Sequence, residues 1–175
     1  MTLTGRIATS DDLPELAPLI DAAITELQRG FLTDDQIRSS RAIMGLDTQL
    51  IDDGTYYVVH SEGKLAGCGG WSRRATLYGA DHSAGRNATL LNPATEPARI
   101  RAMYTHPGFA RRGAGRLVLA LCEQAAAAEG FRELELMATM AGQPLYEAAG
   151  FHDVEHLTDA AGGIPVPLVR MRKRL

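Results

Sequence analysis

Three arginines surround a Gly-Ala-Gly turn in the segment ARRGAGR, residues 110–116. Glycine lets a ligand approach the main chain closely, and a helix that starts at such a turn presents unpaired N–H groups with partial positive charge. Arg111, Arg112 and Arg116 add formal charge beside those amides. Residues of these types at this spacing favour the binding of an anion, and a phosphate group in particular.

The segment lacks two common phosphate-binding patterns. A P-loop continues with lysine and a hydroxyl residue after its second glycine, whereas Arg116 and Leu117 follow Gly115. A dinucleotide fingerprint has a third glycine at the position where this chain has Val118. On this segment alone, a glycine-rich turn with solvated arginines is the alternative to a phosphate site.

The turn lies inside a unit of strand, turn, helix and strand. Residues 99–106 alternate in character as a strand does, and a Pro-Gly pair ends them. Residues 116–130 place apolar side chains on one helical face, and residues 132–139 alternate again. Because a crossover of this kind is right-handed, the sequence predicts two parallel strands with the glycine turn at the start of the helix.

This unit resembles the GCN5-related N-acetyltransferase (GNAT) superfamily. The resemblance is carried by IRAMYTHPGFARRGAGR, residues 100–116, and PLYEAAGF, residues 144–151, and it covers about residues 98–156. Two positions depart from the family pattern. Ala110 stands where the glycine motif usually has arginine or glutamine, and Thr139 where asparagine is common after the second strand. Backbone amides and a threonine hydroxyl still form hydrogen bonds, so neither departure removes the predicted anion site.

Elements outside this unit complete the expected domain. They are a strand ending at 6–9, helices over 13–27 and 33–44, a hairpin over 55–72 and a closing strand over 166–175. Together with the resemblance they imply an α/β (α+β) fold, a single GNAT-like domain over residues 1–175 with its donor-binding core at about 98–156. We expect a central mixed, twisted sheet of about six to seven strands, helices on both faces and a splayed parallel strand pair.

Two further segments have unusual composition. The second strand of the hairpin contains Gly67, Gly69 and Gly70, which either kink the strand or allow another group to lie close to its backbone. Residues 73–97 form a long stretch rich in Gly, Asn, Asp, Ser and Pro, which is typical of a binding loop or a mobile segment.

Composition excludes several classes of partner. A formal charge of −3 over 175 residues gives no general attraction to nucleic acid. No apolar run is long enough to span a bilayer and the first residues lack an export signal, so we expect a cytoplasmic protein without a membrane partner. Cys68 and Cys122 are expected to be reduced, buried thiols. The histidines lack a zinc-binding spacing, so no metal is expected.

The resemblance implies acetyl-CoA as the donor. The donor's pyrophosphate would lie on six consecutive residues, Arg111, Arg112, Gly113, Ala114, Gly115 and Arg116. Its pantetheine arm would bond to the main chain of Met103, Tyr104 and Thr105, and Thr139 would add a hydroxyl. The amide of Met103 would polarise the acetyl carbonyl as a small oxyanion site.

The same chemistry needs groups that move protons. Attack on a thioester needs a neutral amine, so a base or a chain of waters must take a proton from the acceptor. Glu96 is the predicted base, with a solvated loop glutamate as the alternative; His82 and His106 are weaker candidates, and capping is the other role for His106. The resemblance assigns Tyr146 as the acid that protonates the departing thiolate, and a core tyrosine is the alternative.

The resemblance implies an amine as the acceptor. Phe31, Trp71 and Tyr78 are expected to surround it, while Arg73 and Arg74 either meet an acidic acceptor or are solvated. An amino acid, a polyamine, an antibiotic, a peptide N-terminus and a protein lysine all remain open at this stage.

Two other functions and one assembly also remain open. The donor is a longer acyl-CoA in one alternative, and in the other the chain is a non-catalytic sensor that binds acyl-CoA. The terminal strand and the hairpin offer sheet edges through which a homodimer can form.

Overall fold

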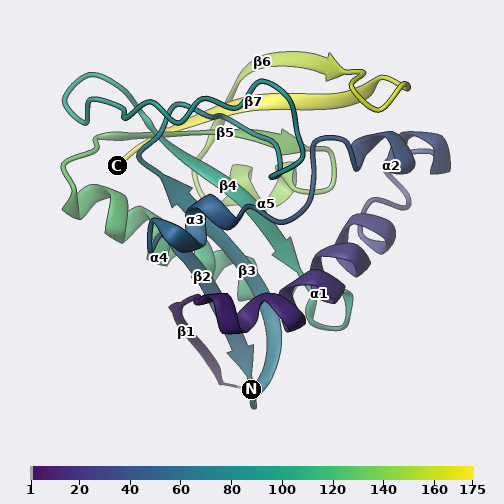
Figure 1. The fold of residues 1–175 in the computed structure, drawn as a ribbon, viewed down its shortest axis with the longest axis horizontal. Helices are drawn as coiled ribbons and strands as arrows, with labels where there is room; N and C mark the ends of the chain where they lie inside the picture. Colours follow the sequence, from purple (N-terminus) through teal and green to yellow (C-terminus); the bar gives the residue numbers. More distant parts are fainter. Residues whose placement is uncertain (1) are drawn as a thin grey trace.

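Seven strands make one mixed sheet in the computed structural model, which describes residues 2–175. Their order is β1-β2-β3-β4-β5-β7-β6, and β4 and β5 form its parallel pair (Figure 1). The strands are β1 Leu3–Ile7, β2 Tyr56–Ser61, β3 Lys64–Ser72, β4 Ala98–Thr105, β5 Glu133–Thr139, β6 His152–Asp159 and β7 Val166–Arg174. The helices are α1 Leu13–Glu26, α2 Asp34–Ser40, α3 Thr48–Asp52, α4 Ala114–Ala128 and α5 Gln143–Ala148. The α/β class and the mixed sheet are therefore confirmed.

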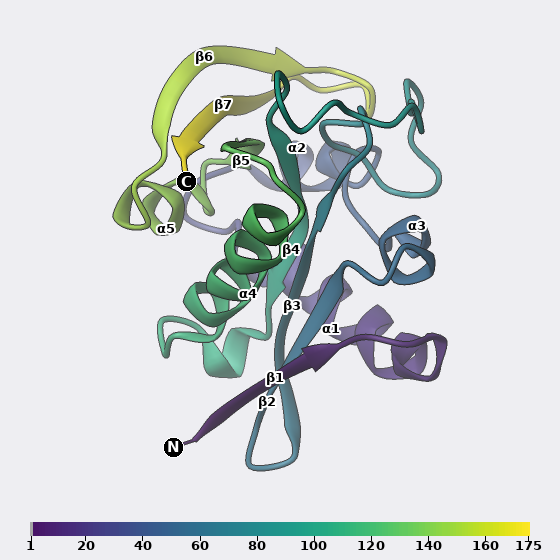
Figure 2. The same cartoon turned by 90° about the vertical axis from the view of Figure 1, so that its left-hand side faces the viewer.

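Helices cover both faces of this sheet, as predicted. Figure 2 shows α4 and α5 on one side of the strands and α1 and α3 on the other. The buried side chains accordingly form two cores. Leu119 and Cys122 of α4 belong to the first, and Leu16 and Ile20 of α1 belong to the second.

Three elements differ from the predictions. The helix expected over 33–44 begins as predicted, with the Thr33 Oγ1 accepting a bond from the Gln36 amide at 3.2 Å, but it ends at Ser40. The short helix α3 and the strand β6 were not predicted. Six of the eight side chains of β6 are fully or mostly exposed at the sheet edge, so β6 lacks the apolar alternation by which strands are recognised.

The parallel pair separates soon after it forms. Its register contains only Ala98 with Leu134 and Arg99 with Glu135 among the described residues. Glu135 is buried at this last pair and forms ion pairs with Arg99 at 3.8 Å and with Arg172 of β7 at 2.6 Å. Beyond it, the C-terminal halves of β4 and β5 are unpaired with each other, as the predicted splay requires.

A bulge interrupts β4 beside this opening. Cys68 of β3 pairs with Tyr104, while Gly70 pairs with Arg101, so β4 contains one residue more than β3 over this interval. Ala102 has φ of 53°, in the left-handed region that alanine rarely adopts. Strained backbone of this kind persists only where its surroundings fix it.

Two glycines of β3 leave space for side chains of the neighbouring strands to lie over β3 close to the bulge. A Cβ on Gly69 would lie 2.2 Å from the Met103 Sδ, and a Cβ on Gly70 would lie 2.9 Å from the Tyr56 ring and 2.7 Å from the Thr55 carbonyl oxygen. The Tyr56 hydroxyl thereby reaches the Ala102 carbonyl oxygen and donates to it at 2.8 Å. The close approach predicted at these glycines is thus made by the protein's own side chains.

Replacing Gly70 by alanine should therefore destabilise the fold. The new methyl group must displace main chain or an aromatic ring, so Gly70→Ala is expected to lower the free energy of unfolding by about 1–3 kcal/mol, measured by urea denaturation. Gly67→Ala on the same strand is the control, because its Cβ would lie 3.3 Å from its nearest neighbour. Equal losses in the two variants would contradict the role given to Gly70.

Candidate functional site

A cavity of about 840 Å³ opens where β4 and β5 separate. Residues 100–105 of β4 line it, and so do Ala110, Arg111 and residues 113–116 at the start of α4. Leu27, Gln28 and Phe31 after α1 and residues 77–79 of the long loop line it as well. One continuous space thus joins the predicted anion site to the predicted acceptor region.

The start of α4 forms the anion-binding end. Gly113 is the N-terminal cap at φ of 93°, a conformation that favours glycine, and the first amides of α4 follow it without partners inside the helix. Arg111, Arg112 and Arg116 are exposed, and within residues 2–175 no carboxylate forms an ion pair with them. Arg111 and Arg116 line the cavity together with Gly113, Ala114 and Gly115, whereas Arg112 does not.

The bulge of β4 forms the centre of the cavity. It is lined by Met103, Tyr104 and Thr105, the three residues whose main chain is predicted to bond to the pantetheine arm. In the described ladders, Met103 has no partner on either β3 or β5. Because the peptide between residues 102 and 103 is planar and trans, the bond from the Tyr56 hydroxyl to the Ala102 carbonyl directs the Met103 N–H the opposite way.

Tyr146 also lines the cavity, near the start of α5. Its ring packs edge-on against Phe151, with centroids 5.9 Å apart, and its hydroxyl forms no hydrogen bond to the described residues. Burial, with a smaller effect of Cys122, raises the pKa of Tyr146 above its usual value, so the phenol is protonated at neutral pH. Thr139 lines the same wall, and its Oγ1 accepts a bond from the Gly142 amide at 3.1 Å.

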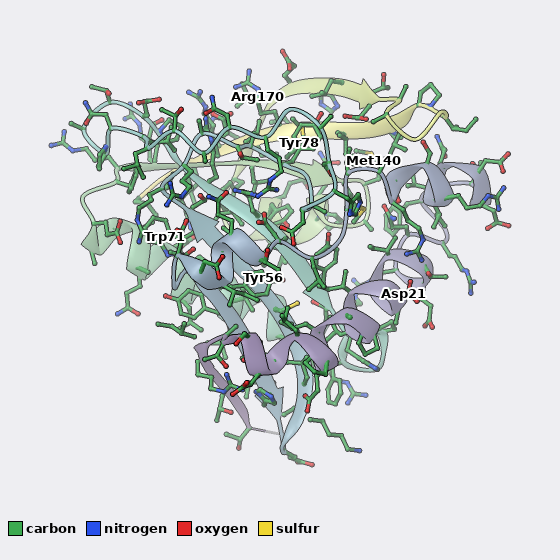
Figure 3. All side chains as sticks on the ribbon, in the orientation of Figure 1. Asp21, Tyr56, Trp71, Tyr78, Met140 and Arg170 are labelled. Carbon is green, nitrogen blue, oxygen red and sulfur yellow. The ribbon has the colours of Figure 1, made fainter. Side chains whose placement is uncertain are left out.

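Two of the three predicted acceptor residues reach the cavity. Phe31 is exposed and lines it, and so does Tyr78, whose hydroxyl donates to Asp159 Oδ2 at 2.6 Å. Burial and this bond raise the pKa of Tyr78 to about 12. In Figure 3, Tyr78 lies beside β7, whereas Trp71 lies apart from it near the end of α4.

Trp71 is not part of this site. It is 2 % exposed, packs against Phe131 with ring centroids 5.9 Å apart and carries the Arg73 guanidinium 5.1 Å from its ring centre. Arg73 pairs with Glu129 at 2.6 Å, and Arg74 pairs with Asp53 at 2.8 Å. Trp71 is therefore a core residue. Arg73 and Arg74 form ion pairs within the protein.

Glu96 lies outside the cavity as well. It lines a separate hollow of about 490 Å³ with Arg132 and Arg174, and its Oε1 accepts a bond from the Asn92 amide at 3.0 Å. The strand from Ala98 to Met103 spans about 17 Å, so Glu96 cannot take a proton from an amine at the bulge. Glu96 therefore lies at the N-terminal end of β4, whereas a base for the acceptor amine is needed near its C-terminal end.

The two histidine candidates have structural partners. His106 Nδ1 accepts a bond from the Gly108 amide at 2.9 Å, which is the capping role considered for it. His82 Nε2 lies 2.7 Å from the Arg41 carbonyl oxygen and donates to it. Among the described residues that line the cavity there is no aspartate, glutamate or histidine.

Sequence reasoning missed Arg101 and Tyr56. Arg101 lines the cavity and is 3 % exposed. A charged residue between the apolar neighbours Ile100 and Ala102 is the signal that could have identified it, because such a residue needs a partner when it is buried. Tyr56 gave no such signal, since its sequence neighbours are those of any buried strand.

Other chemistry-bearing groups are accounted for. Cys68 and Cys122 are free and buried, as predicted, and burial raises the pKa of Cys68 to about 12. In residues 2–175 no three His, Cys, Asp or Glu side chains gather as metal ligands would. No helix in the same range has the length and apolar character to cross a membrane.

Comparisons with solved structures find the same fold in N-acetyltransferases. The structure superposes on a GCN5-related N-acetyltransferase from Rhodopseudomonas palustris with a TM-score of 0.74 and 17 % identity, covering 100 % of this chain and 97 % of the other. It also superposes on the PaiA N-acetyltransferase from Thermoplasma acidophilum, solved in complex with coenzyme A, with a TM-score of 0.69 and 15 % identity over 100 % of both chains. A search of curated protein sequences finds no match.

The sequence itself matches a family model over most of its length. The model of the Acetyltransferase (GNAT) family matches residues 20–151, a range that contains α4, the splayed strands and Tyr146. This chain belongs to the GNAT family of acetyltransferases.

Proposed function

We propose that the protein transfers an acetyl group from acetyl-CoA to an amine by direct attack. The observation that carries this proposal is the single cavity in which the start of α4, the bulge of β4 and Tyr146 meet. The start of α4 supplies a site for the phosphates of acetyl-CoA, and the bulge supplies an N–H that donates a hydrogen bond to the thioester carbonyl. Tyr146 supplies the acid that protonates the leaving thiolate.

The anion-binding end fits a pyrophosphate. The free amides of α4 and the approach that Gly113 permits bind phosphate oxygens, and Arg111 and Arg116 add positive charge from solvent. Ala110 lines this end where the family usually has a longer side chain. The amides therefore contribute more of the affinity than the exposed guanidinium groups, whose charge salt screens.

The bulge provides a main-chain N–H that can donate a hydrogen bond to the reacting carbonyl. The Met103 N–H lies outside both strand ladders and would donate to the thioester oxygen as negative charge develops there. Tyr56 acts as a positioning residue, because its bond to the Ala102 carbonyl fixes the plane of that peptide. The backbone donor is in place before the substrate binds, so little reorganisation accompanies the reaction.

The acceptor nitrogen then forms its bond to the acetyl carbon while the C–S bond breaks. The Tyr146 hydroxyl gives its proton to the departing sulfur, and water restores the phenol. Since no carboxylate or imidazole among the described residues lines the cavity, the proton of the acceptor amine leaves through water. Tyr146 supports an enzyme over the alternative of a sensor that only binds acyl-CoA.

Gly113→Val should abolish donor binding. A β-branched residue is strained at φ of 93° and obstructs the approach to the α4 amides, so titration calorimetry with CoA is expected to show no binding. Gly130→Val is the matched control, because Gly130 has φ of 95° at the other end of α4 and does not line the cavity. Retained CoA affinity in folded Gly113→Val, or its loss in Gly130→Val, would contradict the proposal.

Tyr146→Phe should lower kcat by about 10²-fold or more and leave the Kd for CoA unchanged. Thiol release with acetyl-CoA and an amine library measures the first quantity. Tyr57→Phe is the control, since Tyr57 is buried on the α4 side outside the cavity. Because the pKa of Tyr146 is raised, its deprotonation contributes no fall in the wild-type rate below about pH 10. An unchanged kcat removes Tyr146 from the mechanism.

Tyr56→Phe should reduce kcat about tenfold, with the KM for acetyl-CoA unchanged. The variant keeps the ring over Gly70 and removes only the hydroxyl that holds the Ala102 carbonyl, and a lost hydrogen bond to a buried group costs about 1–3 kcal/mol. A purely structural role predicts a lower Tm with full kcat in the molecules that remain folded, and that result would refute the positioning role.

A further inference from the structure

Arg101 has a buried, incompletely bonded guanidinium and is one of the residues that line the cavity. It precedes the bulge by one residue, lines the cavity and has a side chain that is 1 % exposed. Its Nη2 pairs with Asp47, whereas its Nε and Nη1 have no hydrogen-bond partner in residues 2–175. Buried charged donors without acceptors are costly, so these two nitrogens point to an acceptor group that a ligand supplies.

The charges around Arg101 do not cancel. Asp47 is fully buried and is shared between Arg101 and Arg86, whose Nη2 lies 3.0 Å from Asp47 Oδ1. The next carboxylate, Asp53, is bonded to Arg74. Burial lowers the pKa of Arg101 against the opposing effect of Asp47, but an arginine remains charged at neutral pH. The group formed by Arg101, Arg86 and Asp47 therefore carries one net positive charge.

The part of the cavity near Phe31 and Tyr78 has no carboxylate among its described lining residues. Its walls include Leu27, Phe31, Met44 and Leu77, which are apolar. A second positive charge entering this space would be repelled, while a negative charge would be attracted strongly because the surroundings are poor in water.

We propose that Arg101 binds a carboxylate of the acceptor, so that the substrate is an amino acid and not a polyamine. This inference rests on the proposed transfer to an amine at the bulge. Arg101 and Met103 are two residues apart on β4, one on each side of Ala102. A carboxylate held by Arg101 thus places an amine a few bonds away near the Met103 amide, which suits a compact amino acid.

The test compares acceptors that differ only in charge. Thiol release from acetyl-CoA is measured with the twenty amino acids, their α-amides, the matching decarboxylated amines and spermidine. We expect the best amino acid to exceed its amide at least about tenfold in kcat/KM, as for the loss of a charge-assisted hydrogen bond. Equal values for acid and amide, or a preference for spermidine, would overturn the assignment of Arg101.

Two variants separate direct binding from an effect through Asp47. Both Arg101 and Arg86 pair with Asp47, but only Arg101 lines the cavity. Arg101→Gln should bring the ratio of acid to amide kcat/KM close to one, and Arg86→Gln should keep it. Loss of the ratio in both variants would assign the preference to Asp47 and overturn the proposal. If Arg101→Gln does not fold, the comparison of wild-type acceptors decides alone.

Binding experiments distinguish this proposal from the proposed function. If acetyl-CoA neither binds nor releases thiol with any amine, the transferase proposal fails. The carboxylate site is then judged by the Tm of the wild-type protein with each amino acid and its amide. A rise with an acid but not with its amide supports Arg101 as a carboxylate site, and no rise overturns it.

Discussion

The separation of β4 from β5 is the constraint on which the site depends. Glu135 lies at the last paired position and draws arginines from β4 and β7 onto one buried carboxylate. β5 keeps its full antiparallel pairing with β7, and β4 keeps β3, so the sheet survives the opening between them. The main-chain groups along the opening must bond to something other than a strand. An extended ligand with its own amides satisfies that requirement, which explains why the cavity follows β4.

The bulge shows how the protein maintains strained backbone at this position. Ala102 is held from one face by the Tyr56 hydroxyl, and the Met103 side chain occupies the space that a Cβ on Gly69 would take. Gly69 and Gly70 weaken β3 as a strand, since they add no side chains to its packing. Larger residues at these two positions would exclude the groups that fix the bulge. The glycines thus make β3 locally less stable, but they allow the Met103 N–H to stay outside the strand ladders.

The parts that could be predicted from sequence are those that local backbone determines. The glycine turn, the helix after it and the strand before it are encoded within residues 99–130, and the structure places them together. Glu96 and Trp71 were misplaced for a different reason. Their positions depend on which end of a strand, and which face of the sheet, borders the cavity, and periodicity gives neither. Arg101 was missed because its partner Asp47 lies more than fifty residues away in sequence.

The two anion sites proposed for this protein lie in physically different environments. Arg111 and Arg116 stand in solvent, where screening limits each charge to a small contribution, so the amides of α4 and the shape at Gly113 must select the donor. Arg101 is buried, where the same charge acts through a low dielectric and lacks a complete set of acceptors. We therefore assign the proposed discrimination between acceptors by charge to the buried arginine, since the exposed arginines are too strongly hydrated to reject a cationic amine.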